Sequence, residues 1–273
     1  MIKLGVNSVL FRDFDFATAA KMIALSGYDG VEIAAIKGMC EHLELDRWEE
    51  QAEEIKKAAA DNGLELLSME VASLDDARLT KAFEAASALG IPVVNVGPGG
   101  KEGVEEDLQA SIETLAALSK KAEAYGVTLC VKAHFGNAIH DTPTTLRAME
   151  AISSPAFGID MDPSHIYRSM EEPQESLKKV LSRVKHIHIR DCKGRNKGPG
   201  PIQDQACGRG DIDLYAYCKA MVDGQYSGPV CLEVIGANQH SLAEVSIIAA
   251  ESYGYLNACL KALNARETTT EGI

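Results

Sequence analysis

The segment KKAEAYGVTLCVKAH, residues 120–134, contains the pattern from which the fold can be inferred. A polar, alanine-rich stretch typical of a helix ends at Gly126, and a short apolar run typical of a buried strand follows at once. Glycine is the residue expected where a helix ends in the left-handed conformation. The segment therefore predicts a helix, a tight turn and a buried strand.

The same order of helix, glycine and strand occurs three times before this segment. The earlier glycines are Gly27, Gly63 and Gly90, and consecutive glycines are 27 to 36 residues apart, the length of one strand–helix unit. Alternation of this kind implies a parallel sheet with crossover helices. Further strands are predicted at 156–162, 184–191 and 229–236, and further helices near 143–152, 173–182, 211–223 and 241–263.

Counting along the chain predicts eight strands and eight helices, so we expect an α/β fold, a single-domain (βα)8 TIM barrel. The barrel is predicted to span residues 1–265, and residues 266–273 are predicted to form a disordered tail. The length of 273 residues suits one such barrel. An open, doubly wound sheet is the alternative. The glycine-rich segment 194–210 is longer than a routine turn and is predicted to be a functional loop.

Composition excludes some classes of function. The net charge of -13 argues against nucleic acid as a partner, because phosphate contacts require a basic surface. No apolar run approaches the roughly 18 residues of a membrane span. Seven scattered cysteines without a C-x-x-C pair favour reduced thiols and a cytoplasmic protein. The sequence leaves open whether the chain forms a homo-oligomer.

Polar side chains are predicted at the inner face of every strand, near its C-terminal end. In a parallel barrel this is the end that carries the active site. Glu32 also has a structural interpretation, as a partner in a core hydrogen bond, and Asp160 and His186 lie deeper and are expected to support the site. The predicted inward-facing polar residues are Asn7, Glu32, Ser68, Glu70, Asn95, Lys132, His134, Asp160, Asp162, His186, His188 and Glu233.

Asp162, His188 and Glu233 come from three consecutive predicted strands and should converge. Two carboxylates and an imidazole suit Mn²⁺, Mg²⁺ or Fe²⁺ better than a thiolate-rich zinc site would. The same three groups could instead bind substrate hydroxyls without a metal.

Five motifs in order give the chain a resemblance to the xylose isomerase-like barrel superfamily. That group includes sugar isomerases, ketose 3-epimerases, hydroxypyruvate isomerase, inosose dehydratase and apurinic endonucleases. The resemblance covers nearly the whole chain. The motifs are GYDGVEI (27–33), GIDMDPSH (158–165), HIHIRD (186–191), GRGDIDL (208–214) and CLEV (231–234).

The resemblance implies that Asp162, His188 and Glu233 match three of the four metal ligands of epimerase-like members. The fourth is a glutamate on the fifth strand, and here Lys132 takes its place. A protonated lysine has no lone pair for a metal. A divalent ion with its glutamate carries one net positive charge, and so does one protonated lysine. Replacing the ion and the glutamate together by Lys132 would therefore leave the net charge of the site unchanged.

Three roles for Lys132 are therefore open. The site could hold Mn²⁺ or Mg²⁺ on the other three ligands, Lys132 could act without a metal as an electrophile or general acid, or it could form a Schiff base. The predicted catalytic residues are Lys132 and Glu233. The residues predicted to bind substrate are Glu70, His134, His165, Arg190 and Arg209.

The function expected from the resemblance is that of a carbohydrate isomerase or epimerase acting by proton transfer next to a carbonyl of a small sugar or keto-sugar. With Lys132 protonated, only Glu233 is an obvious carbon base, which favours a one-base reaction. Two alternatives are a sugar dehydratase or other lyase, with Lys132 replacing the glutamate, and a non-catalytic sugar-binding or partner subunit. The net charge and missing zinc ligands argue against the endonuclease branch.

Overall fold

The structure is a computed structural model that describes residues 2–195 and 198–266. Its strands are β1 (Lys3–Asn7), β2 (Gly30–Ile36), β3 (Cys40–Glu41), β4 (Glu65–Glu70), β5 (Val93–Val96), β6 (Thr128–Lys132), β7 (Phe157–Met161), β8 (Val184–Ile189) and β9 (Pro229–Leu232). Its α-helices are α1 (Phe16–Leu25), α2 (Trp48–Asp61), α3 (Asp76–Leu89), α4 (Glu105–Glu123), α5 (Thr142–Ala151), α6 (Pro163–Arg168), α7 (Pro173–Val180), α8 (Ile202–Gln205), α9 (Leu214–Asp223) and α10 (Leu242–Ala262).

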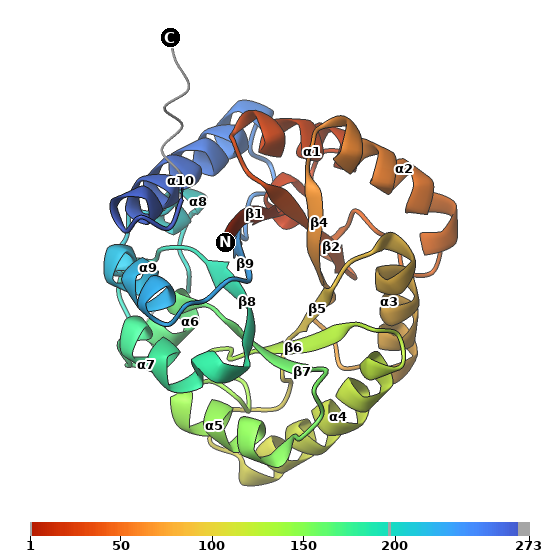
Figure 1. The fold of residues 1–273 in the computed structure, drawn as a ribbon, viewed down its shortest axis with the longest axis vertical. Helices are drawn as coiled ribbons and strands as arrows, with labels where there is room; N and C mark the ends of the chain where they lie inside the picture. The colour runs from red at the N-terminus through yellow and green to blue at the C-terminus, as the bar shows by residue number, and fades with distance from the viewer. Residues whose placement is uncertain (1, 196–197, 267–273) are drawn as a thin grey trace.

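Eight parallel strands close into a barrel that is ringed by helices (Figure 1). The strand order is β1-β9-β8-β7-β6-β5-β4-β2, and β1 pairs with β2 to complete the ring. The short strand β3 lies outside the ring, antiparallel to β2. The predicted single-domain TIM barrel is confirmed, and the open-sheet alternative is wrong because β1 has a neighbour on each side.

Local sequence signals explain where the helices begin and end. Asp15 and Asp75 cap the first turns of α1 and α3 through their side chains, and Ser241 forms a capping box at α10. Gly90 ends α3 at φ 74°, and Gly126 follows α4 at φ 70°. Both adopt the left-handed conformation that the sequence pattern predicts at these glycines.

The structure also contains elements that the sequence analysis did not predict. The six-residue helix α6 follows β7 directly, and α8 lies within the predicted loop 194–210, of which residues 196–197 lie outside the described residues. Arg266, the first residue of the predicted tail, pairs through its guanidinium with Asp29 at 2.6 Å. The rest of the predicted tail, 267–273, lies outside the described residues.

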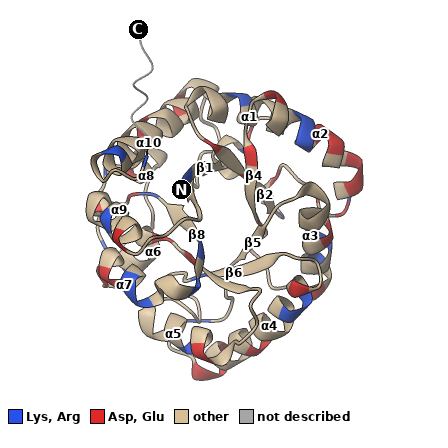
Figure 2. Cartoon of the chain, viewed as in Figure 1, with Lys and Arg blue, Asp and Glu red and all other residues tan. Residues whose placement is uncertain are grey.

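The charged residues of the chain lie largely on the helices around the barrel, with both signs mixed (Figure 2). Within residues 2–195 and 198–266, no helix has the length and apolar character needed to cross a membrane.

Small residues let a leucine fill the N-terminal part of the barrel. The register between β2 and β4 shifts between Val31 and Glu32, and Leu67 packs against Gly5 and Gly30. A Cβ on Gly30 would lie 2.5 Å from the backbone oxygen of Glu65 and 2.6 Å from Cγ of Leu67. Packed side chains therefore fill the barrel near the N-terminal ends of the strands, and polar side chains occupy it near the C-terminal ends.

We predict that Gly30→Ala lowers the free energy of unfolding by about 1–3 kcal/mol, because overpacking forces the backbone or Leu67 to move. Urea denaturation of the full chain measures the effect. Gly254→Ala in α10 is the matched control, because a Cβ there meets nothing within 4 Å. It should be neutral or stabilise by up to about 1 kcal/mol, as expected for glycine in a helix interior. Equal effects of the two substitutions would contradict the packing argument.

Candidate active site

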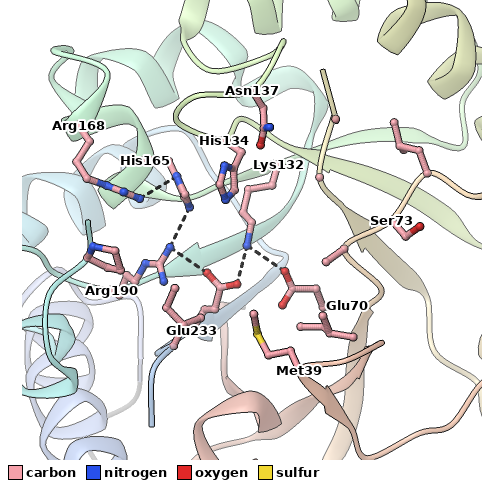
Figure 3. Close-up of a pocket in the computed structure, with 17 residues that line it drawn as sticks. Met39, Glu70, Ser73, Lys132, His134, Asn137, His165, Arg168, Arg190 and Glu233 are labelled. Carbon is pink, nitrogen blue, oxygen red and sulfur yellow. Dashed lines mark hydrogen bonds and ion pairs between the residues drawn. The ribbon is translucent and has the colours of Figure 1, made fainter. Parts of the chain in front are cut away.

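A pocket of about 420 Å³ opens at the C-terminal end of the barrel (Figure 3). Apolar side chains, among them Ile36, Met39 and Leu74, form part of its wall. The structure brings together in it six residues predicted for the site: Glu70, Lys132, His134, His165, Arg190 and Glu233.

The ammonium group of Lys132 lies between two glutamates. Its Nζ donates to Oε1 of Glu233 at 2.6 Å and to Oε1 of Glu70 at 3.0 Å, and it lies 3.3 Å from Nδ1 of His188. Lys132 is only 4% exposed, so it does not reach solvent at the barrel mouth. Burial alone would lower its pKa, but the carboxylates of Glu233 and Glu70 outweigh burial and hold the pKa well above its usual range.

The two glutamates differ in how strongly they are held. Glu233 contacts Lys132 through one oxygen, and its other oxygen lies 3.3 Å from Nη2 of Arg190. Burial opposes its ionisation, yet these two cations hold the pKa of Glu233 well below its usual range. Among the described residues, Glu70 forms an ion pair with Lys132 alone, and it accepts a hydrogen bond from Asn7 at 2.5 Å. Burial and the nearby Glu233 raise the pKa of Glu70 to about 7.

A second buried network lies beneath the glutamates. Nε2 of His188 is 2.5 Å from Glu32, and its Nδ1 is 2.6 Å from Asp160. Asp160 also contacts Nδ1 of His186 at 2.9 Å, and Asn95 donates to Glu32 at 2.6 Å. Burial would lower the pKa of His188, but Asp160 and Glu32 raise it well above its usual value. His188 is therefore an imidazolium that both carboxylates hold in place.

On the opposite side of the pocket, a histidine separates two arginines. Nδ1 of His165 lies 2.9 Å from Nη2 of Arg168, and its Nε2 lies 2.9 Å from Nη2 of Arg190. The backbone N–H of Phe135 also donates to Nδ1, so Nδ1 is the acceptor in a neutral ring. The ring of His134 lies 4.0 Å from that of His165, and burial lowers the pKa of both histidines.

Arg168 was missed in the sequence analysis. It follows His165 by three residues, and residues three apart on a helix lie on the same face. That spacing was a signal that could have identified Arg168, had the short helix α6 been predicted.

Comparison with known proteins identifies the family of the chain. A family model described as a xylose isomerase-like TIM barrel matches residues 20–252 of the chain. The chain belongs to the xylose isomerase-like TIM barrel family. An inosose dehydratase of Clostridium perfringens is 24% identical over 85% of this chain and 89% of that protein.

Two solved structures of similar fold cover nearly the whole of this chain. An IOLI protein with a bound zinc atom has a TM-score of 0.78 and 20% identity, over 94% of this chain and 98% of that chain. A D-tagatose 3-epimerase-like protein has a TM-score of 0.76 and 20% identity, over 96% and 98%. At these identities the likeness shows the fold alone.

The zinc atom in that relative raises the question of whether the three predicted ligands of this xylose isomerase-like chain fit a divalent cation. His188 has both ring nitrogens against carboxylates and, as an imidazolium, has no lone pair to offer. Asp162 accepts from the backbone of Ser164 at 2.8 Å and lies 3.0 Å from Nη2 of Arg190. Glu233 is held between Lys132 and Arg190. In this arrangement cationic side chains take the place of a metal, so the predicted trio does not fit one.

Other groupings of ligand-type side chains do exist in the part of the chain that the structure describes. Four sets of three His, Cys, Asp or Glu residues have ligand atoms within 4.8 Å of one another. One set joins Asp162 and Glu233 with His165, but none of the four joins Asp162 and Glu233 with His188. The structure therefore brings Asp162 and Glu233 together with His165, and it connects His188 to Glu233 through Lys132.

Arg209 lies outside the pocket of this xylose isomerase-like barrel. Its guanidinium pairs with Glu251 of α10 at the surface, and its side chain is 40% exposed. The structure therefore does not bring Arg209 to the pocket with the other residues predicted to bind substrate. The GRGDIDL motif lies at the end of the predicted loop 194–210, and the side chain of Arg209 pairs with Glu251 of α10.

We predict that Asp160→Asn destabilises the protein by about 3–5 kcal/mol, because it removes one charge from a buried network and leaves the His188 imidazolium with one partner fewer. Thermal and urea unfolding measure this cost. Asp223→Asn is the control, since Asp223 pairs with Lys219 at the surface and its side chain is 57% exposed. The control should leave the unfolding midpoint unchanged. An unchanged midpoint for Asp160→Asn would show that the network is not coupled to folding.

Proposed function

We propose that the chain is a lyase that removes water from a polyhydroxylated ketone through proton transfer next to the carbonyl, without a bound metal. The observation that carries the proposal is the Lys132 ammonium, held between Glu70 and Glu233 where epimerase-like members are expected to have a metal ligand. The inosose dehydratase among the relatives supports dehydration over the isomerisation or epimerisation expected from the sequence.

Lys132 is suited to stabilise the enolate. When a ketone loses a proton from the neighbouring carbon, negative charge develops on the carbonyl oxygen. A fixed ammonium in a buried site stabilises that charge, as a Lewis acid does elsewhere. Because the two carboxylates already hold Lys132, it needs no reorganisation as the charge forms.

We assign the carbon base to Glu70 rather than to Glu233, the base expected from the sequence. Glu233 faces a cation at each oxygen, which lowers its basicity. Glu70 is in direct contact with one cation, Lys132, and the His188 ring lies within 4.8 Å of it. Its pKa of about 7 is near the value at which a general base works best in neutral solution. Glu233 then serves to position Lys132 and Arg190.

The steps balance without a further reagent. Glu70 takes the proton from the carbon next to the carbonyl, and the electron pair of the broken C–H bond forms the enolate. As the enolate re-forms the carbonyl, a double bond forms between the α- and β-carbons. The C–O bond to the hydroxyl on the β-carbon breaks at the same time. The proton on Glu70 passes to the departing hydroxide, giving water and an unsaturated ketone.

The asymmetry of the two glutamates also argues against 3-epimerisation. Epimerisation needs a proton acceptor on each face of the carbon. With Glu233 neutralised by Lys132 and Arg190, Glu70 remains as the single strong acceptor of the pair. One-base isomerisation uses the same Glu70, so the product must distinguish it from dehydration.

The first test is incubation of the full chain with linear and cyclic polyhydroxy ketones in D₂O, followed by NMR and mass spectrometry. We expect one substrate to exchange its α-proton and lose the mass of water. Glu70→Gln should lower the rate by about 10²–10⁴-fold, the usual contribution of a general base. The control Arg209→Gln should leave the rate unchanged. Exchange that yields only an isomer would contradict the lyase assignment, and no exchange over the whole set would contradict the proposed enzyme.

The second test concerns metal. We expect purified protein to contain no stoichiometric divalent cation, and Lys132→Glu to gain affinity for Mn²⁺, because it places a third carboxylate beside Glu70 and Glu233. Elemental analysis and calorimetry measure both. Lys132→Met is the control, since it removes the ammonium without adding a ligand. Stoichiometric metal in the unaltered protein would contradict the metal-free assignment.

The third test is the pH dependence of kcat/KM. Glu70 must be ionised to accept a proton, so the rate should fall as the pH drops through about 7. Glu233→Gln should shift this acidic limb of the pH–rate profile toward lower pH, because removal of the Glu233 carboxylate favours ionisation of Glu70. A limb that stays in place in Glu233→Gln would show that the two glutamates do not interact.

A further inference from the structure

Arg168 differs from the other buried cations of the site. Lys132 pairs with Glu70 and Glu233, Arg190 pairs with Asp162 and Glu233, and His188 lies between two carboxylates. Arg168 lines the same pocket and is only 6% exposed. Across residues 2–195 and 198–266, however, no carboxylate forms an ion pair with it.

The contacts that Arg168 does make are neutral. Its Nε donates to the carbonyl of Ser164 at 3.1 Å, and its Nη2 donates to Nδ1 of His165 at 2.9 Å. The guanidinium carbon lies 5.4 Å from the centre of the Phe135 ring. These contacts fix the plane of the guanidinium, and Figure 3 shows it directed toward His165 and the pocket. No hydrogen bond within the described residues uses Nη1.

A buried charge without a partner costs free energy, and arginine does not avoid that cost by losing its proton. Burial lowers the pKa of Arg168; Asp162, which forms no ion pair with it, opposes this at longer range, and repulsion from Arg190 adds to it, but a guanidinium remains charged at neutral pH. The missing counter-charge must therefore come from whatever occupies the pocket.

We propose that Arg168 binds a carboxylate of the substrate, which makes the substrate class a polyhydroxylated keto acid rather than a neutral sugar. This inference rests on the proposed function, because it names the substrate of the same site. A carboxylate matches one planar guanidinium in charge and shape. A phosphate carries nearly two charges at neutral pH and would leave one of them without a partner at this position.

Arg168 and the reacting groups are connected through the pocket wall. His165 contacts both Arg168 and Arg190, and Arg190 contacts Glu233, which holds Lys132. A carboxylate bound at Arg168 would therefore fix the substrate at one side of the pocket, with its hydroxylated carbons extending toward Glu70 and Lys132. Arg168 is a binding residue in this account and takes no part in the proton transfers.

The test compares pairs of probes that differ only at the acidic group or nearly so. D-gluconate and D-glucitol share a six-carbon polyol chain, and quinate and myo-inositol are hydroxylated rings with and without a carboxylate. Calorimetry with the full chain should show at least one carboxylate binding about tenfold or more tightly than its neutral partner, the effect of one charge-assisted hydrogen-bonded pair.

Arg168→Met should abolish this preference while leaving the affinity for the neutral probe unchanged. Arg168→Lys should retain part of it, since the charge remains but the planar fork is lost. Arg183→Met is the matched control. Arg183 also lies 5.4 Å from a phenylalanine ring, that of Phe157, and donates to backbone carbonyls, but it lies outside the pocket. It should keep the preference.

Three results would overturn the inference. They are equal binding of both members in every pair, a carboxylate preference that survives Arg168→Met, and tighter binding of D-glucitol 6-phosphate than of D-gluconate that depends on Arg168. Circular dichroism of each variant establishes that it is folded.

The binding test separates this inference from the proposed lyase activity. One outcome is a carboxylate preference that depends on Arg168 in a protein that dehydrates none of the ketones. It would support the anion-binding site and contradict the proposed lyase activity. Dehydration of a keto acid at the same rate by Arg168→Met and by the unaltered protein would leave the reaction intact and overturn the substrate class.

Discussion

A lysine ammonium that is 4% exposed must be neutralised where it lies, and the active site is arranged around that requirement at Lys132. Its partners Glu70 and Glu233 are 62 and 101 residues away in the sequence. Around the ring, Glu70 lies on β4, two strands from β6, and Glu233 follows β9, three strands from β6 in the other direction. Both contacts exist together only when the strands from β4 to β9 have assembled. The charge network therefore forms as part of the closed barrel and cannot form in any of its strand–helix units alone.

The two ends of the barrel meet different requirements. Near the N-terminal ends, Gly5 and Gly30 leave room for Leu67, and close packing determines which side chains are allowed. Near the C-terminal ends, buried carboxylates and cations lie side by side, and they alternate from β6 to β9 through Lys132, Asp160, His188 and Glu233. Replacing buried ion pairs by apolar groups is often neutral or stabilising, so their presence at one end indicates function more than stability.

Much of the fold and part of the site could be predicted from the sequence. The recurring glycine after each helix predicts the barrel, and period-two spacing predicts that Lys132 and Glu233 face inward. The partners of His188 could not be predicted, because whether an imidazole contacts Glu32 and Asp160 or a neighbouring Glu233 depends on the depth of each side chain in the barrel. Arg168 and Arg209 show the same limit outside the strands. A motif locates the backbone of an arginine, but helix geometry and the nearest carboxylate decide where its long side chain ends.

The position of Lys132 has a consequence for how such a site could arise. Glutamate and lysine codons differ at the first base only, so a single nucleotide transition converts the expected metal ligand of the family into the ammonium found here. That transition changes the side-chain charge by two units, the same charge that a divalent ion removes when it leaves. Ancestors on either side of the change would each have held a balanced site, and no intermediate genotype with an uncompensated charge would have been needed.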